Sequence, residues 1–277
     1  IETWLPKADG QWSMVAVGSA LAFNQQAIGT LAPSLRVTPH AEQTTTIYAR
    51  VTSPTTPFYV RVMSRDDSAH FDSLIQLVVG SFIGISLILS LLSFMIYTMT
   101  RDRLWLFDVL FNLSGLSILL IQIGLASKLI WPSSTDWVNQ LCLIANCFYP
   151  FATSLLHRQI FRLYALAPWL YWPNTLALLS FPVLLGLIVA GYGDVAMRIN
   201  NATIFLLSCY GVVVAIKAQH ADRLMLLGFR VSYFGFITSF IWWGLDYVYQ
   251  LQTGSLVTLY PGFPASLFTM LMLLLIL

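Results

Sequence analysis

The string Gly191-Tyr192-Gly193-Asp194 has the GxGD form of an intramembrane aspartyl protease. Such an enzyme needs two aspartates that face each other within the membrane, so that one carboxylate acts as base while the other stays protonated. Asp194 lies between two apolar runs, and the acidic residues within other runs, Asp108 and Asp246, are far from it in the sequence. We therefore interpret the string as a glycine-rich turn.

Histidine and cysteine, the other residue types that could catalyse or bind a metal, are also poorly placed for it. The four histidines fall outside the predicted spans: His40, His70, His157 and His220. A zinc or serine intramembrane protease therefore lacks its ligands or its base. The three cysteines lie in apolar runs without a CxxC pair: Cys142, Cys147 and Cys209. We expect no catalytic residue, no metal site and no cofactor.

Two charged residues inside apolar runs could form an interhelical ion pair. Asp108 lies five residues beyond Arg103, and Arg230 lies seven residues beyond Arg223. On a helix these positions are about 7 and 10 Å in from the same flank of the membrane. Because ionisable residues in spans usually face the bundle interior and find partners, we predict a pair between Asp108 and Arg230. The alternative is that Arg230 extends to the headgroups and Asp108 is hydrated.

Gly80 and Gly84 form a small-xxx-small motif within the first long apolar run. This spacing lets two helix backbones approach closely. Packing inside the bundle and a seam between two copies of the chain both remain open.

The composition shows what must position these residues. Of the 277 residues, 57% are hydrophobic and 9% are charged, whereas a soluble domain carries roughly 25% charged residues. The sequence therefore excludes a soluble globular protein and indicates a lipid bilayer as partner. The net charge of +2 is too small for a nucleic-acid binder.

Apolar runs from residue 74 onward predict helices that cross the membrane, since a helix needs roughly 20 residues to do so. Six of them are complete, at residues 74–98, 104–126, 137–156, 172–190, 197–216 and 224–249. A seventh run ends at Leu277 without a polar flank, and we predict a truncated helix there. Residues 73–277 are thus predicted to form a bundle of six complete helices and one truncated transmembrane helix.

Residues 1–72 have a different character, since they hold eleven of the 26 Lys, Arg, Asp and Glu residues. Apolar and polar residues alternate over 12–17, 46–51 and 58–62, and turn-forming residues separate these segments. The pattern predicts antiparallel strands. So few strands bury little surface alone, so we expect the end of a larger β-sandwich. The chain is expected to begin and end within a longer protein, because Ile1 starts no signal sequence.

Basic residues set the expected orientation, because cytoplasmic loops are rich in Lys and Arg. Only Lys128 and Arg198 lie in the loops after the second, fourth and sixth spans. Six basic residues lie after the first, third and fifth spans: Arg101, Arg103, Arg158, Arg162, Lys217 and Arg223. The second set is therefore expected in the cytoplasm, with residues 1–72 outside.

Three stretches resemble bacterial seven-transmembrane receptors with diverse intracellular signalling modules. They are Tyr97-Thr98-Met99-Thr100-Arg101-Asp102-Arg103-Leu104-Trp105-Leu106, Ile123-Gly124-Leu125-Ala126-Ser127-Lys128-Leu129-Ile130-Trp131-Pro132 and His157-Arg158-Gln159-Ile160-Phe161-Arg162-Leu163. In addition, Thr44-Thr45-Thr46-Ile47-Tyr48-Ala49-Arg50-Val51-Thr52-Ser53 is similar to the last strands of the periplasmic jelly-roll domain of that family. The resemblance implies a jelly-roll sensor followed by seven helices in the bacterial inner membrane.

The resemblance also implies a function. In that family the periplasmic domain is thought to bind carbohydrate or another small ligand. The helices pass the signal to a histidine kinase of a two-component system, a diguanylate cyclase that makes cyclic di-GMP, or a phosphatase. The fragment itself is then a receptor and not an enzyme, with a homodimer as a further partner. A polytopic transporter is the alternative, although the spans show no internal repeat and few charges.

Overall fold

The computed structural model describes residues 1–6, 11–17, 21, 23–25, 34–37, 45–50, 62–130, 133, 135–164 and 167–253. The chain divides into two compact units. The first unit comprises Ile1–Ser73 and Leu119–Cys142, and the second comprises Leu74–Ile118 and Leu143–Leu277. The division of the chain into domains at residues 72 and 73 stays a prediction.

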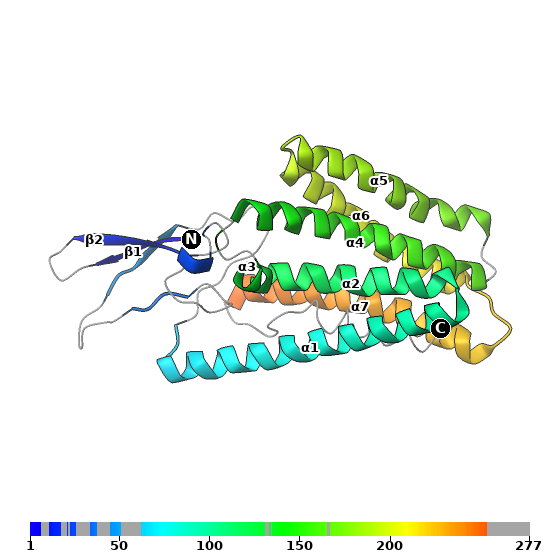
Figure 1. Cartoon of the computed structure of the whole chain (residues 1–277), viewed down its shortest axis with the longest axis horizontal. Helices are drawn as coiled ribbons and strands as arrows, with labels where there is room; N and C mark the ends of the chain where they lie inside the picture. The colour runs from blue at the N-terminus through cyan, green and yellow to red at the C-terminus, as the bar shows by residue number, and fades with distance from the viewer. Residues whose placement is uncertain are drawn as a thin grey trace. The chain divides into compact units, whose positions relative to one another are not determined.

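A three-stranded antiparallel sheet lies in the first unit, in the order β2-β1-β3 (Figure 1). It consists of β1 (Glu2–Pro6), β2 (Trp12–Ala16) and β3 (Tyr48–Arg50). The alternating patterns predicted β2 and β3, whereas β1 was not predicted from the sequence. The strand predicted at 58–62 falls almost wholly outside the described residues. The sheet is antiparallel as predicted, and the β-sandwich with its jelly roll stays a prediction.

Helices make up most of the rest of the described chain. In chain order they are η1 (Phe23–Gln25), α1 (Arg65–Thr100), α2 (Arg103–Gln122), α3 (Leu125–Leu129), α4 (Thr135–Leu163), η2 (Pro168–Tyr171), α5 (Trp172–Val189), α6 (Gly193–Lys217) and α7 (Arg223–Thr253). Four segments are long and apolar enough to cross a membrane: Arg65–Thr100, Arg103–Ile121, Pro168–Val189 and Gly193–Lys217. The predicted seventh helix lies within residues 254–277, outside the described part, so the count of seven stays a prediction.

Side chains fix the ends of the first two long helices. Ser64 caps α1, because its hydroxyl accepts the Asp67 backbone N–H at 3.1 Å and donates to the Asp67 carboxylate at 2.7 Å. Arg101 ends α1 with a φ of 57°, in the left-handed region. Asp102 then caps α2 by accepting the Leu104 N–H at 3.0 Å. The Arg-Asp-Arg sequence is therefore a tight link between two antiparallel helices.

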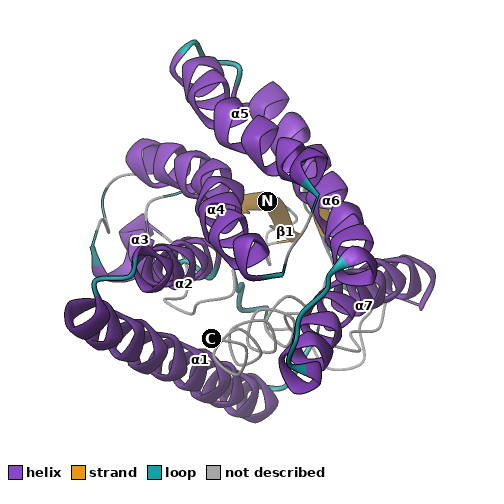
Figure 2. Cartoon of the chain, turned by 90° about the vertical axis from the view of Figure 1, so that its right-hand side faces the viewer, coloured by secondary structure: helices purple, strands orange, loops and turns teal. Residues whose placement is uncertain are grey.

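The second unit places α4 among other helices and α5 at the margin. Viewed along the helices, α4 lies between α2 and α6 (Figure 2), and Leu156, Ile160 and Phe161 on it are fully buried. Only 17% of the most apolar window of α5 is buried. Because α4 faces protein on several sides, it can hold polar residues that α5, which exposes its surface, cannot. This explains why α4 is less apolar than the four segments above.

The GxGD string forms the turn between α5 and α6, as the sequence predicted. Gly191 ends α5 with a φ of 86°, a conformation that favours glycine. Gly193 begins α6, and a Cβ there would lie 2.8 Å from a methyl carbon of Leu143. Asp194 is exposed in the first turn of α6, where a carboxylate complements the helix dipole. Both glycines and the aspartate thus have a structural role.

Candidate functional sites in the helical unit

Five polar residues, Ser86, Ser90, Ser93, Asp108 and Asn112, form a buried polar seam between α1 and α2. Each is at most 6% exposed. The Ser93 hydroxyl donates to Oδ2 of Asp108 at 2.6 Å, and Nδ2 of Asn112 donates to the same oxygen at 3.0 Å. The Ser90 hydroxyl donates to the Ser86 carbonyl at 2.8 Å. The seam therefore holds one carboxylate in a fixed set of short hydrogen bonds.

The seam is the continuation of the inner stripe of α1. Buried residues on α1 recur in alternating steps of four and three: Ile75, Val79, Phe82, Ser86, Leu89 and Ser93, with Ser90 beside them. This is the heptad spacing of a helix that packs along a neighbour. The first half of the stripe is apolar and the second half is largely serine, so α1 presents its polar half to Asp108.

Arg230 on α7 binds the end of α6. Its Nε donates to the Ala215 carbonyl at 3.2 Å, and Nη2 donates to the Ala218 carbonyl at 3.4 Å. Ala215 lies in the last turn of α6, and Ala218 is the C-cap residue. The last carbonyls of a helix lack partners within it and carry a partial negative charge, so a guanidinium there is favourable. Arg230 thus fixes the start of α7 to the end of α6.

The structure does not join the two members of the predicted ion pair. Asp108 bonds with Ser93 and Asn112, whereas Arg230 bonds with carbonyls of α6. Over the described residues no ion pair links the two side chains. Direct pairing of Asp108 with Arg230 therefore stays a prediction, and each residue has a separate role in the structure.

A second site is an aromatic cluster made by three helices. Its members are His157, Phe161 and Tyr164 at the end of α4, Tyr210 on α6, and Phe229 and Tyr233 on α7. The Tyr164 and Phe229 rings stack with centroids 4.1 Å apart, and Phe161 contacts the rings of Tyr210, Phe229 and Tyr233. Phe161, Tyr164 and Phe229 are fully buried. Apolar contact between rings therefore holds α4, α6 and α7 together at this end.

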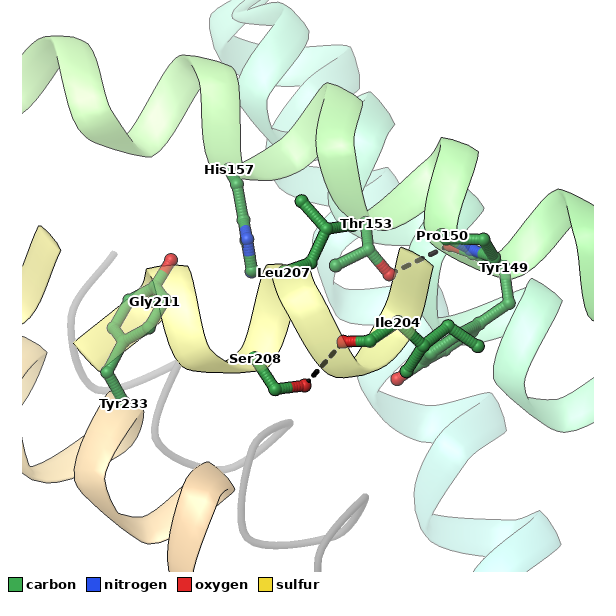
Figure 3. A pocket seen from close by; sticks show the side chains of 9 residues that line it. All are labelled: Tyr149, Pro150, Thr153, His157, Ile204, Leu207, Ser208, Gly211 and Tyr233. Carbon is green, nitrogen blue, oxygen red and sulfur yellow. Dashed lines mark hydrogen bonds between the residues drawn. The ribbon is translucent and has the colours of Figure 1, made fainter. Parts of the chain in front are cut away.

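A cavity opens beside this cluster (Figure 3). Thr153 and Ser208 line it, but each hydroxyl bonds with a carbonyl of its own helix at 2.8 Å. His157 of α4 and Tyr233 of α7 point toward one another across it, with ring centroids 5.3 Å apart. The buried Tyr233 hydroxyl has no hydrogen-bond partner among the described residues, and neither has that of Tyr210. The cavity is therefore mainly apolar, and the few polar groups that line it come from α4, α6 and α7.

The position of His157 corrects the sequence analysis. A loop outside the spans was expected there, but α4 extends to Leu163 and His157 lies within the helix. The helix continues because Leu156, Ile160 and Phe161 extend its buried face past the first basic residue. Arg158 and Arg162 lie in this helical extension and not in a loop.

The Gly80 and Gly84 motif lies on an open part of α1. Gly80 is exposed and Gly84 is half-buried. A Cβ added at either glycine would meet no atom of the described residues within 4 Å. The described helices therefore do not use these glycines for close packing, and a seam with a second copy stays a prediction.

Two patterns in the sequence point to the polar seam: a charged residue within an apolar run, and the spacing of the polar residues around it. Asp108 is a charge within an apolar run, and the sequence analysis found it for that reason. The serines and Asn112 follow from the heptad stripe of α1 and from the step of four between Asp108 and Asn112. The aromatic cluster has no local signal, because its rings come from three helices. The described residues contain no group of three or more His, Cys, Asp or Glu side chains that could hold a metal ion.

Comparison with known proteins gives one match. A family model described as 7TM diverse intracellular signalling matches residues 75–277. The match begins within α1 and includes every residue of the polar seam and of the aromatic cluster. No curated protein and no solved structure matches the chain.

Proposed function

The chain belongs to the 7TM diverse intracellular signalling family, and on that premise we propose that it is the sensory and membrane part of a receptor in the bacterial inner membrane. Residues 1–72 form the end of a periplasmic sensor domain, and the helices relay its state to a cytoplasmic output domain. The family is a sensory receptor domain and not an enzyme domain. The chain therefore transmits a signal, and chemistry takes place in the output domain.

The observation that carries this proposal is the length of α1. The helix runs without a break for 36 residues, from Arg65 to Thr100. At 1.5 Å per residue it is about 54 Å long, against a hydrocarbon core of about 30 Å. Its first eight residues include Arg65, Asp66, Asp67 and Asp72, which belong in water. A continuous helix that leaves the membrane on the sensor side can carry a displacement of the sensor into the bundle.

The far end of α1 lies where both candidate sites are found. The polar seam is near the α1–α2 link, and the aromatic cluster is near the end of α4 and the α6–α7 link (Figure 1). Most basic residues near the ends of the spans lie at this end of the bundle. Because Lys and Arg are enriched on the cytoplasmic side of membrane proteins, we place this end in the cytoplasm. A shift of α1 against α2 then acts on the membrane face closest to the output domain.

The ligand and output follow from the family. A carbohydrate or another small periplasmic molecule is the proposed ligand. The proposed output is a histidine kinase, a diguanylate cyclase or a phosphatase in the same chain, and the receptor is proposed to act as a homodimer. For signalling, the ligand must bind one of two arrangements of the sensor more tightly than the other. It then shifts the equilibrium between the two arrangements by its difference in affinity for them.

The relay can be tested in the full-length protein by interrupting α1 between Ser73 and Leu74. Seven inserted glycines weaken the helix, since glycine is about 1 kcal/mol per residue less favourable there than alanine. Seven inserted alanines are the matched control, because they extend the helix by nearly two turns and keep its faces almost aligned. We expect the glycine insertion to uncouple output activity from the sensor while the alanine insertion preserves regulation. Equal regulation in both variants, with both inserted in the membrane, contradicts a relay through α1.

A further inference from the structure

The carboxyl group of Asp108 forms no ion pair with a described residue; it accepts hydrogen bonds from Ser93 and Asn112. The Ser93 hydroxyl donates to its Oδ2 at 2.6 Å, a short O–H···O hydrogen bond. Asn112 donates to the same oxygen. Both contacts suit the ionised form of the side chain, which accepts hydrogen bonds and donates none. Asp108 is 5% exposed within a membrane-spanning helix.

A buried anion in a span normally has a positive partner, because an isolated charge there is costly. Arg230 was the expected partner, but its guanidinium donates to the Ala215 and Ala218 carbonyls of α6. No other basic residue of the described chain forms an ion pair with Asp108. The hydrogen bonds from Ser93 and Asn112 are dipolar and leave the net charge in place.

Further oxygen atoms lie near the Asp108 carboxyl group. The hydrogen bonds from Ser93 and Asn112 to this group both fall on Oδ2, so neither of them uses Oδ1. Asn112 is 2% exposed, and its Oδ1 is buried without a hydrogen-bond partner among the described residues. Since Nδ2 of the same amide donates to Asp108, this oxygen is held close to the carboxylate. Ser90 lies one turn from Ser93 on the same face of α1, and its hydroxyl keeps lone pairs free while it donates to the Ser86 carbonyl.

We propose that the polar seam binds one monovalent alkali cation, Na⁺ or K⁺, between the carboxylate of Asp108 and the amide oxygen of Asn112. Hard cations take oxygen ligands of this kind: carboxylate, amide carbonyl and hydroxyl. The single carboxylate balances a single positive charge, whereas a divalent ion would leave an uncompensated charge in the bundle. Both cation ligands lie on α2, and the Asp108 carboxyl that holds the ion also accepts the Ser93 hydroxyl of α1. Binding of the ion therefore stabilises the arrangement of α1 and α2 in which that hydrogen bond forms.

The test is thermal unfolding of the purified chain in detergent, with choline chloride replaced stepwise by NaCl or by KCl at constant ionic strength. A ligand that binds only the folded state raises the midpoint in a saturable way. At a tenfold excess of cation over its dissociation constant, we expect a rise of about 4 °C. The NaCl and KCl series identify which ion binds more tightly.

Three variants locate the effect. Asp108→Asn removes the charge and should abolish the response to both ions. Asn112→Leu removes the amide oxygen and should raise the half-saturating concentration by about tenfold or more. Asp194→Asn is the matched control, because it removes an exposed aspartate of α6 and should respond as the wild type does.

Other outcomes overturn the proposal. Equal midpoints in choline, sodium and potassium show that no alkali cation binds, and this result needs no variant. A midpoint that rises as the pH falls, without any effect of the ions, shows that Asp108 takes up a proton instead. A rise that persists in Asp108→Asn is a general effect of salt and not a site at the seam.

Discussion

The polar seam and the aromatic cluster hold the same end of the helical unit by different physics. In the seam, a buried carboxylate accepts two directed hydrogen bonds, one of 2.6 Å from Ser93. In the aromatic cluster, rings from α4, α6 and α7 pack around Phe161, and two tyrosine hydroxyls have no hydrogen-bond partner among the described residues. Directed bonds to a charge specify one geometry. Ring packing in which some polar groups are unsatisfied tolerates several geometries, and a cavity adjoins it.

The difference suggests separate roles in a receptor. The seam fixes α1 against α2, and in the proposed relay α1 is the helix that receives the movement of the sensor. The aromatic cluster and Arg230 fix α7 against α4 and α6. Because packed interfaces are bistable rather than continuously deformable, the cluster is suited to change between two arrangements. Under the proposed relay, the seam belongs to the input side and the cluster to the side that moves α7.

The largest expected effect is at the centre of the aromatic cluster. Phe161→Ala should lower the free energy of unfolding by about 3–5 kcal/mol, because it leaves a cavity among fully buried rings. Phe205→Ala is the matched control, since Phe205 on α6 is 60% exposed. Thermal or denaturant unfolding in detergent measures both. Similar losses in the two variants would mean that the cluster is not the core of this end of the bundle.

Removing one donor from the seam should have the next largest effect. Ser93→Ala should cost about 1.5–3 kcal/mol, as expected for a hydrogen bond to a charged group. Ser117→Ala is the control, because Ser117 is an exposed serine that bonds only with a carbonyl of its own helix. The same unfolding assay compares them. If both serines behave alike, the seam lacks the directed character that separates it from the cluster.

A double-mutant cycle decides whether the seam and the α6–α7 link are connected directly. The structure gives Asp108 and Arg230 separate partners, so the losses in Asp108→Asn and Arg230→Gln should add within about 0.5 kcal/mol. The ion pair predicted from the sequence requires instead that the double variant lose less than the sum, because each single change strands a charge. A coupling above 1 kcal/mol, on the scale of about 0.5–3 kcal/mol for residues in contact, would establish that pair.

The smallest expected effect on folding is at the open glycines of α1. Gly84→Ile should change the free energy of unfolding by about 0.5 kcal/mol or less, since no described atom lies within 4 Å of the added Cβ. Gly211→Ile, the matched control on α6, should cost about 1–3 kcal/mol, because the added Cβ meets the Tyr233 ring at 2.8 Å. Crosslinking between copies then tests the dimer seam. If Gly84→Ile folds and crosslinks like the wild type, the glycines do not join two receptors.

The sequence predicted the elements better than the contacts between them. Each of the six predicted spans falls on a helix of the described chain, with ends that differ from the predicted ones by up to nine residues, and four of these segments are long and apolar enough to cross a membrane. Apolar length and charged links such as Arg101-Asp102-Arg103 mark such helices locally. The end of α4 was placed too early, because Arg158 was taken as the start of a loop although it lies on the helix. Asp108 was identified as a buried ionisable residue, but its partners depend on the rotation of α1 and α2. The bonds of Arg230 with the end of α6 depend likewise on how α7 packs, which no local pattern records.

The most direct test of the receptor assignment is the orientation of the helical links. A reporter that is active only in the cytoplasm is inserted after Lys217, at the end of α6, and a second copy is inserted after Lys128 in α3. Six basic residues against two predict that the Lys217 insertion is active and the Lys128 insertion is silent. The sensor is then periplasmic, and α7 leads back across the membrane from the cytoplasmic side. If the Lys128 insertion is active and the Lys217 insertion is silent, the topology is the reverse of the predicted one, and the assignment of the chain as a receptor is contradicted.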